Sequence, residues 1–202
     1  MDKNKTKHKV LRAALSLFYQ KGYNATSVRD IAKKAGVNIS LISYYFDSKQ
    51  GLFEYAVIQY YENYIALIKQ TLQETKHLSP EDQFKKLIYT IIHYKHEYEK
   101  LSCFIHRELS VDSLFMREVF TTYVAKENYL LKERFNEFIK EVNLSQINKE
   151  YLFMQFKGLL ATPYMMHNEF KESLLHPSTN ENFVKKYTET ILYLLEQAKI
   201  SP

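Results

Sequence analysis

The chain has 202 residues, of which 46% are hydrophobic and 25% charged, a composition typical of a globular protein with a buried core. Only four glycines and four prolines interrupt it, which favours long helices over many short strands. No apolar run approaches a membrane span, the first residues lack a hydrophobic signal segment, and the single cysteine, Cys103, has no partner for an internal disulfide. We therefore expect a cytoplasmic protein.

Positive charge is concentrated in the first quarter of the chain. Residues 1–50 contain ten lysines and arginines against three aspartates, a net charge of +7, whereas the remaining residues sum to −2. A solvated lysine-rich tail would explain Lys3 to Lys9 alone, but the positive charge continues from Arg29 to Lys49. The distribution predicts an N-terminal module that binds a polyanion.

Helical periodicity begins within the first ten residues, and a glycine at position 22 is its stop signal. A serine-capped short helix is expected over 28–35, followed by a turn at Gly36 and a second short helix over 39–45. A long helix over 48–72 comes next. Three short helices therefore lead into a long one.

The rest of the chain continues the helical pattern without strand-like alternation. Ser79 and Pro80 form a start signal for a helix that reaches residue 92. Further helices are expected over 101–109, 112–141, 147–174 and 179–198. The sequence therefore predicts an all-α fold.

The stretch GVNISLISYYFDSKQG at residues 36–51 interleaves polar and apolar side chains. On a helical wheel Ile42, Tyr45 and Phe46 share one side, while small polar residues and Tyr44 occupy the other. A short helix, a glycine turn and a second short helix form a helix-turn-helix, whose second helix enters the major groove of DNA. A small helical hairpin with a solvated face would explain the outer polarity equally well.

The order of residues across the whole region is more specific than its parts. TSVRDIAKKAGV at residues 26–37, followed by ISYYFDSKQGL at residues 42–52, resembles the DNA-binding domain of the TetR family of bacterial regulators. The resemblance covers roughly residues 6–54. It implies an all-helical homodimer, with a helix-turn-helix domain over 1–50 and a helical dimerisation and regulatory domain over 51–202.

The resemblance also implies DNA contacts position by position. A helix N-terminus with two hydroxyl side chains can hold a phosphate, and a tyrosine and a lysine can contact the DNA backbone. An arginine can read guanine, and an isoleucine can touch a thymine methyl. Double-stranded DNA with near-palindromic sites is the expected partner. The predicted contact residues are Thr26, Ser27, Arg29, Asn38, Ile39, Ser40, Ser43, Tyr44 and Lys49.

The C-terminal part suggests packing rather than chemistry. Its many tyrosines and phenylalanines could line an effector pocket, but rings at helical spacing are more often core or dimer interface. His93, His96, Cys103 and His106 have spacings compatible with zinc, yet histidines on amphipathic helices are mostly ordinary. No metal or other cofactor is expected. Since no nucleophile–base pair or phosphate loop is present, we expect no enzyme.

The dimer interface is expected on the helices over 147–174 and 179–198. Two helices from each subunit would form a four-helix bundle. The residues predicted to form it are Phe156, Leu159, Leu160, Phe183, Ile191, Leu194 and Leu195.

A longer stretch points to a narrower role. Residues 98–131, which mix apolar side chains with charges of both signs, resemble RefZ-type TetR-like proteins of spore-forming bacilli, together with residues 38–46 and 162–164. That resemblance implies a nucleoid-associated dimer that links chromosome position to division-septum placement during sporulation and acts on the tubulin-like FtsZ ring. Intramolecular ion pairs would explain most of these charges. The residues predicted to form a partner face are Glu54, Glu62, Arg107, Arg117 and Glu118.

Three hypotheses therefore stand. The first is this DNA-bound regulator of division, with no obligatory small ligand. The second is a ligand-responsive TetR-type transcriptional repressor. The third is a helical membrane-surface protein whose basic N-terminus binds anionic lipid, and it explains the lysines but not the ordered pattern from Thr26 to Lys49.

Overall fold

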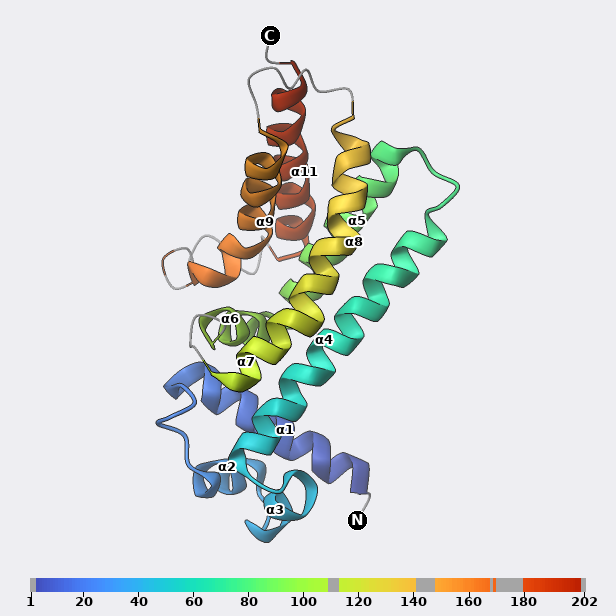
Figure 1. Ribbon diagram of the computed structural model, residues 1–202. Helices are drawn as coiled ribbons and strands as arrows, with labels where there is room; N and C mark the ends of the chain where they lie inside the picture. The colour runs from blue at the N-terminus through green and yellow to red at the C-terminus, as the bar shows by residue number, and fades with distance from the viewer. Residues whose placement is uncertain (1–2, 109–112, 141–147, 168, 170–179, 201–202) are drawn as a thin grey trace. The chain divides into compact units, whose positions relative to one another are not determined.

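The computed structural model describes residues 3–108, 113–140, 148–167, 169 and 180–200, and all regular elements in these ranges are helices (Figure 1). The predicted all-α class is confirmed. Among the described residues, no helix combines the length and apolar character needed to cross a membrane. The elements are α1 Lys3–Lys21, α2 Val28–Ala35, α3 Ser40–Phe46, α4 Lys49–Glu74, α5 Pro80–Glu97, α6 Glu99–Glu108, α7 Leu114–Val119, η1 Phe120–Val124, α8 Ala125–Phe138, α9 Lys149–Met165 and α11 Asn180–Ile200.

The chain divides into two compact units. The first comprises Met1–Asn63 and Lys100–Val119, and the second comprises Tyr64–Glu99 and Phe120–Pro202. The first unit thus holds α1, α2 and α3 together with α6 and α7, and α4 runs through both units. The functional division predicted at residue 50 remains a prediction.

A cluster of aromatic rings forms the core of the first unit. Phe18 of α1 stacks on Phe104 of α6 with ring centroids 5.5 Å apart. Phe53 of α4 lies 5.5 Å from both Phe104 and Phe115 and 5.3 Å from Tyr23. These contacts hold α1 and α6 against the first half of α4.

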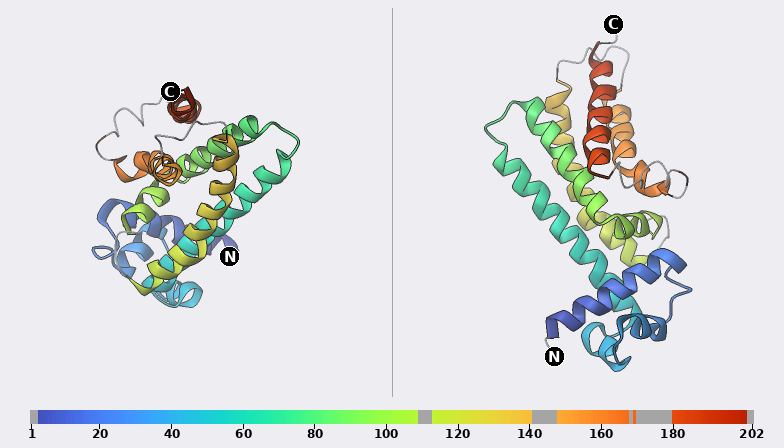
Figure 2. Two further views of the ribbon diagram at one scale, coloured as in Figure 1. Left: turned by 45° about the horizontal axis from the view of Figure 1, so that its top comes forward. Right: turned by 180° about the vertical axis from the view of Figure 1, so that it is seen from behind.

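The second unit has its own aromatic core. Phe84 of α5 stacks on Phe138 of α8 at 4.6 Å, and Phe135 of α8 stacks on Phe156 of α9 at 5.4 Å. Figure 2 shows α9 and α11 side by side, next to α5. The buried face of α11 includes Ile191, which is fully inaccessible to solvent.

The helix predicted over 147–174 is shorter in the structure, where α9 ends at Met165. Pro163 lies inside its last turns and has no N–H to donate to the carbonyl of Leu159. The Tyr187 hydroxyl of α11 donates to that carbonyl instead, at 2.7 Å. The proline thus creates a free acceptor that ties α11 to α9.

The helix predicted over 112–141 is not uniform within its described part. A π-helical segment, η1, separates α7 from α8. A π turn adds one residue and rotates the buried face of the helix that follows. Buried side chains include Met116 and Val119 before it, and Leu131 and Phe135 after it.

An ionic cluster lies inside the second unit. The buried Glu127 carboxylate accepts hydrogen bonds from the Tyr64 hydroxyl at 2.6 Å and from the Lys157 ammonium. Burial alone would raise the pKa of Glu127, but Lys157, Lys95 and the two hydrogen bonds outweigh it and lower the pKa to about 2. The Lys95 ammonium, also buried, donates to the Leu160 carbonyl at 3.4 Å.

Candidate nucleic-acid interface

The turn between α2 and α3 gives the first unit a helix-turn-helix geometry. Gly36 has φ +62° and ψ +43°, the left-handed conformation that favours glycine. Its N–H and the Val37 N–H both reach the Ala32 carbonyl, which closes the end of α2. Because Ile42 and Phe46 are buried, the opposite face of α3 is left to solvent.

Ser27 and Asp30 close the N-terminus of α2. The Ser27 hydroxyl accepts the Asp30 N–H at 3.1 Å and donates to the Asp30 carboxylate at 2.8 Å, and the Ser27 N–H donates to the same carboxylate at 3.1 Å. These hydrogen bonds lower the pKa of Asp30. Ser27 is exposed, as a phosphate contact requires, but its hydroxyl is already engaged in this capping box.

Thr26 occupies a different place from the one predicted. Its side chain is buried, and its hydroxyl donates to the Gly22 carbonyl at 2.8 Å. The expected phosphate contact from this hydroxyl is therefore corrected. Thr26 instead fixes the loop that leads into α2.

Lys49 also turns inward. Its ammonium donates to the carbonyls of Tyr23 and Thr26, both at 2.9 Å, and lies 4.2 Å from the centre of the Tyr23 ring. These carbonyls belong to the loop before α2, which no helix satisfies. The lysine that was predicted to neutralise a phosphate thus stabilises the loop that positions α2.

The N-cap position of α3 is Ile39, one residue after the Asn38 cap that the sequence predicted, and Asn38 stands next to it. The Asn38 side-chain oxygen accepts the backbone N–H and the hydroxyl of Ser40, both at 2.9 Å. This contact compensates for an N–H that the helix leaves free. Both side chains are exposed at the leading end of α3.

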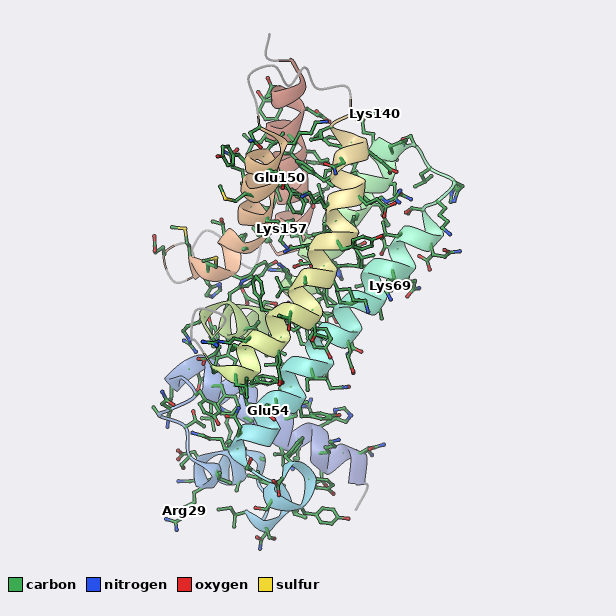
Figure 3. The ribbon with its side chains drawn as sticks, viewed as in Figure 1. Arg29, Glu54, Lys69, Lys140, Glu150 and Lys157 are labelled. Carbon is green, nitrogen blue, oxygen red and sulfur yellow. The ribbon has the colours of Figure 1, made fainter. Side chains whose placement is uncertain are left out.

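The remaining predicted contacts are exposed to solvent on α2, on α3 and in the turn between them. Arg29 extends away from the ribbon (Figure 3), and Tyr44 is 67% exposed. Tyr45 is only half-buried, and its ring meets that of Tyr44 edge to face, with centroids 5.1 Å apart. We call the exposed set of five the reading surface: Arg29, Ile39, Ser40, Ser43 and Tyr44.

The turn into α4 carries constraints that the sequence reasoning missed. Asp47 has φ +68°, and the Ser48 N–H reaches back to the Phe46 carbonyl at 2.7 Å. A Cβ placed on Gly51 would lie 2.2 Å from that carbonyl oxygen. Only glycine fits at this point, where α4 begins against the end of α3.

Several exposed basic side chains were included in the net charge of residues 1–50 but were not predicted as DNA contacts. They stand on α1 and on the last turn of α2, and each is exposed to solvent. They are Lys5, Lys9, Arg12, Lys21, Lys33 and Lys34.

The predicted dimer residues fall into two groups. Phe156, Leu160, Ile191 and Leu195 are at most 3% exposed in the single chain, so they have almost no surface to offer a second copy. This part of the expectation is corrected, because those side chains form the core of the second unit. Leu194 is 46% exposed, and the other two, Leu159 and Phe183, are partly exposed.

The five charges predicted as a partner face all belong to the first unit. Arg107 donates to a carbonyl of α1 at 3.0 Å. Glu54 and Glu62 each accept a hydrogen bond from a glutamine of the same helix, at 2.9 and 2.8 Å. Arg117 and Glu118 are exposed on α7.

Two of the three histidines considered for zinc make ring contacts. His93 stacks on Tyr89 at 5.9 Å, and His96 lies 5.1 Å from the Phe183 ring. Cys103 is buried. Within the described residues, no three or more histidine, cysteine, aspartate or glutamate side chains are grouped so as to hold a metal ion.

Comparison with known proteins agrees with this geometry. The sequence pattern of the bacterial regulatory proteins of the tetR family matches residues 10–56. A Bacillus subtilis (strain 168) protein described as "Probable HTH-type transcriptional regulator YttP" is 36% identical over 186 residues, which span 92% of this chain and 90% of that protein. The chain belongs to the TetR family. Members of this family are dimeric DNA-binding transcriptional regulators.

Solved structures of transcriptional regulators share the fold. PfmR from Thermus thermophilus superposes with a TM-score of 0.73 at 17% identity, covering 91% of this chain and 97% of that one. HlyIIR, a hemolysin II transcriptional regulator, gives a TM-score of 0.66 at 20% identity, covering 94% and 98%. Neither of these proteins nor the Bacillus subtilis relative is described as a division or sporulation protein.

Proposed function

We propose that this chain is a homodimeric TetR-type transcriptional repressor that binds near-palindromic operator DNA and responds to a small ligand. The reading surface is the observation that carries the proposal. It groups side chains able to contact base edges and backbone on two helices whose relative position is fixed by a closed turn. The family membership supports the same function.

The chemistry of the reading surface indicates which residues would recognise the DNA sequence and which would supply most of the affinity. Between Gly36 and Tyr45 the chain has no lysine or arginine, so Arg29 supplies the one strong base-reading group of the surface. The exposed lysines around α1 and α2 would contact phosphates. Operator binding should therefore weaken steeply as salt is raised.

The test is a genome-wide map of binding sites, followed by affinity measurements on the sites found. Arg29→Ala and Tyr44→Ala should each weaken binding to those sites by about tenfold or more, since each removes a contact worth roughly 1–3 kcal/mol. Tyr129→Ala is the matched control, because Tyr129 is 72% exposed on α8 in the other unit. Normal binding by both reading-surface variants would show that this surface does not contact DNA.

A revised dimer interface belongs to the same proposal. On α9, Tyr151 and Met154 are each 64% exposed, and on α11 Tyr193 and Leu194 are 60% and 46% exposed. The two helices lie side by side, so these apolar side chains can meet the same helices of a second copy. The interface would thus use the outer faces of α9 and α11, while their inner faces form the core.

We also propose, as the narrower alternative, that the regulator positions the division septum through the FtsZ ring. It is supported by the sequence resemblance over residues 98–131 and by the exposure of Glu62, Arg117 and Glu118. The same genome map tests it. Sites at set distances around the replication origin, indifferent to promoters, would favour this role, whereas sites that overlap promoters would favour the repressor.

A further inference from the structure

A cavity of about 280 Å³ opens among α4, α5 and α8 in the second unit. Its lining comes entirely from long or polar side chains and one leucine. The lining residues are Lys69, Leu72, Gln73, Lys76, Gln83 and Arg134. Three cationic side chains, two amides and no carboxylate therefore face one space.

The two lysines line the cavity from α4 and from the turn that follows it. Lys69 lies in α4, which ends at Glu74, and Lys76 lies in the turn just beyond that end, with Gln73 between the two in the sequence. Both are exposed, and neither makes an ion pair with a described carboxylate. Their charges have no counterion within the described protein, which makes the cavity attractive to an anion.

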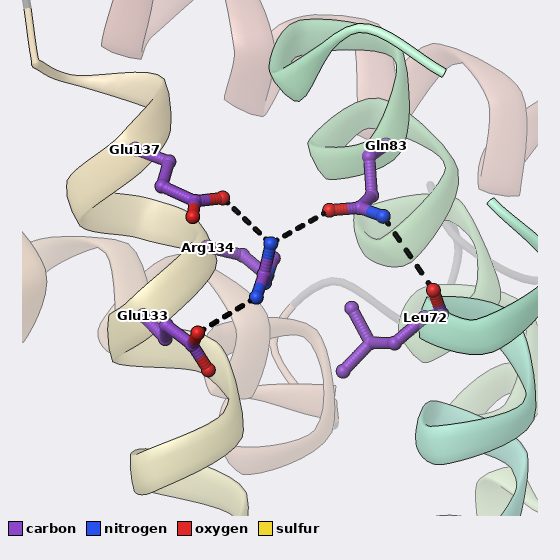
Figure 4. A network of polar contacts seen from close by, with 5 residues as sticks. All are labelled: Leu72, Gln83, Glu133, Arg134 and Glu137. Carbon is purple, nitrogen blue, oxygen red and sulfur yellow. Dashed lines mark hydrogen bonds and ion pairs between the residues drawn. The ribbon is translucent and has the colours of Figure 1, made fainter. Parts of the chain in front are cut away.

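Arg134 is held in place at the opposite wall (Figure 4). Its guanidinium donates to Gln83 at 3.1 Å, to Glu137 at 2.7 Å and to Glu133 at 2.8 Å. These bonds use the two terminal nitrogens. The Arg134 Nε–H is buried and has no acceptor among the described residues.

Gln83 completes a wall that is already ordered. Its side chain is only 6% exposed, its oxygen accepts from Arg134, and its amide nitrogen lies 3.5 Å from the Leu72 carbonyl. A buried amide fixed at both ends keeps the guanidinium in one orientation. Little side-chain ordering would then oppose binding at this wall.

The size of the cavity limits what can bind. It exceeds several times the volume of roughly 30 Å³ that one water molecule occupies, yet it lies at the lower limit of pockets for drug-sized ligands. We propose that it binds a small polyvalent anion whose carboxylate or phosphate oxygens contact Lys69, Lys76 and the Arg134 guanidinium. A role for this anion as the effector rests on the proposed function.

The binding step can be measured without DNA. Calorimetric titration of the full chain with citrate and, separately, with inorganic phosphate would be made at constant ionic strength and constant pH. Lys69→Gln/Lys76→Gln should weaken binding of the preferred anion by about tenfold or more, since two of its charged contacts are lost. Lys85→Gln/Lys185→Gln changes the net charge equally on exposed residues of the same unit that do not line the cavity, and should bind within about twofold of the wild type.

Each outcome decides the matter. Binding of either anion that is lost only in the cavity variant supports the site and tells a carboxylate ligand from a phosphate ligand. Absence of binding to both up to about 10 mM, or equal loss in the two double variants, overturns it.

The effector role has a separate measurement. The preferred anion is added to protein bound to an operator from the genome map, again at constant ionic strength. Release from the wild type but not from Lys69→Gln/Lys76→Gln is the expected result, because simple screening would act on both. If the anion binds but the protein recognises no operator, the proposed function fails while the site stands. If operators are bound and the anion never alters their affinity, the effector role is overturned.

Discussion

Lys49 shows how one side chain can look like a DNA contact in the sequence and act first inside the protein. A lysine at the start of a helix below a reading surface fits a phosphate contact, and its sequence position alone supports that role. In the structure its ammonium joins two carbonyls of the loop that precedes α2.

Lys49→Met should therefore lower stability as well as DNA affinity. Losing two hydrogen bonds from a charged donor should cost about 2 kcal/mol of unfolding free energy, measured by chemical denaturation. Lys33→Met is the control, because Lys33 is exposed in the last turn of α2 and should lose DNA affinity alone. Equal stability of the two variants would show that the loop contacts of Lys49 contribute nothing.

The buried Lys95 is a second residue whose role only the fold reveals. Burial lowers its pKa to about 8, an effect that the nearby Glu127 carboxylate partly offsets. Between this pKa and the ordinary value of 10.5, the unfolded chain holds a proton that the folded chain has released. The free energy of unfolding should therefore rise with pH in that range.

Comparing the wild type with Lys95→Met isolates this dependence. Between pH 8 and about pH 9.5 the wild type should gain roughly 1.5 kcal/mol relative to the variant, measured by denaturation at each pH. The range ends there because Tyr94 and Tyr187, whose pKa values are raised by burial, oppose the trend at higher pH. Lys126→Met, at an exposed lysine of α8, should keep the wild-type slope, and parallel curves for all three proteins would exclude the effect.

Among the secondary-structure elements, those whose ends are set by nearby residues could be predicted from the sequence. The sequence predicts the short helices α2 and α3, because Ser27, Gly36 and Asn38 act on backbone groups within a few residues of themselves. It does not predict η1 or the end of α9. Those depend on packing and on a donor, Tyr187, that the chain supplies from another helix.

The turn from α3 to α4 could be predicted from the sequence only in part. Gly51 is visible in the sequence, but the sequence does not explain why glycine is needed there. The explanation is the carbonyl of Phe46, which the folded turn places where a Cβ on residue 51 would lie 2.2 Å from its oxygen. Gly51→Ala must displace α3 or α4, so we expect a loss of about 2–4 kcal/mol of unfolding free energy together with weaker DNA binding. Asn63→Ala, at an exposed site on the same helix, should be neutral or slightly stabilising. A Gly51→Ala protein as stable as this control would contradict the tight turn.

In the whole molecule, α9 and α11 must pack into the core of their own subunit and, in the proposed dimer, also contact a second copy. The sequence pattern located α9 and α11 as the interface helices but did not separate their faces, because leucine and phenylalanine suit either environment. Burial makes the separation: Ile191 and Leu195 face inward, and Tyr193 and Leu194 face outward.

This division predicts which substitution breaks the dimer without unfolding the subunit. Leu194→Asp places a charge on the outer face of α11 and should shift the protein to monomers in sedimentation experiments while its helical content is kept. Leu78→Asp, at a leucine 39% exposed between α4 and α5, should leave the dimer intact. Since two reading surfaces must face major grooves about 34–36 Å apart, the monomeric variant should bind a half-site but lose the affinity gained from two joined half-sites. A dimeric Leu194→Asp protein would place the interface elsewhere on the molecule.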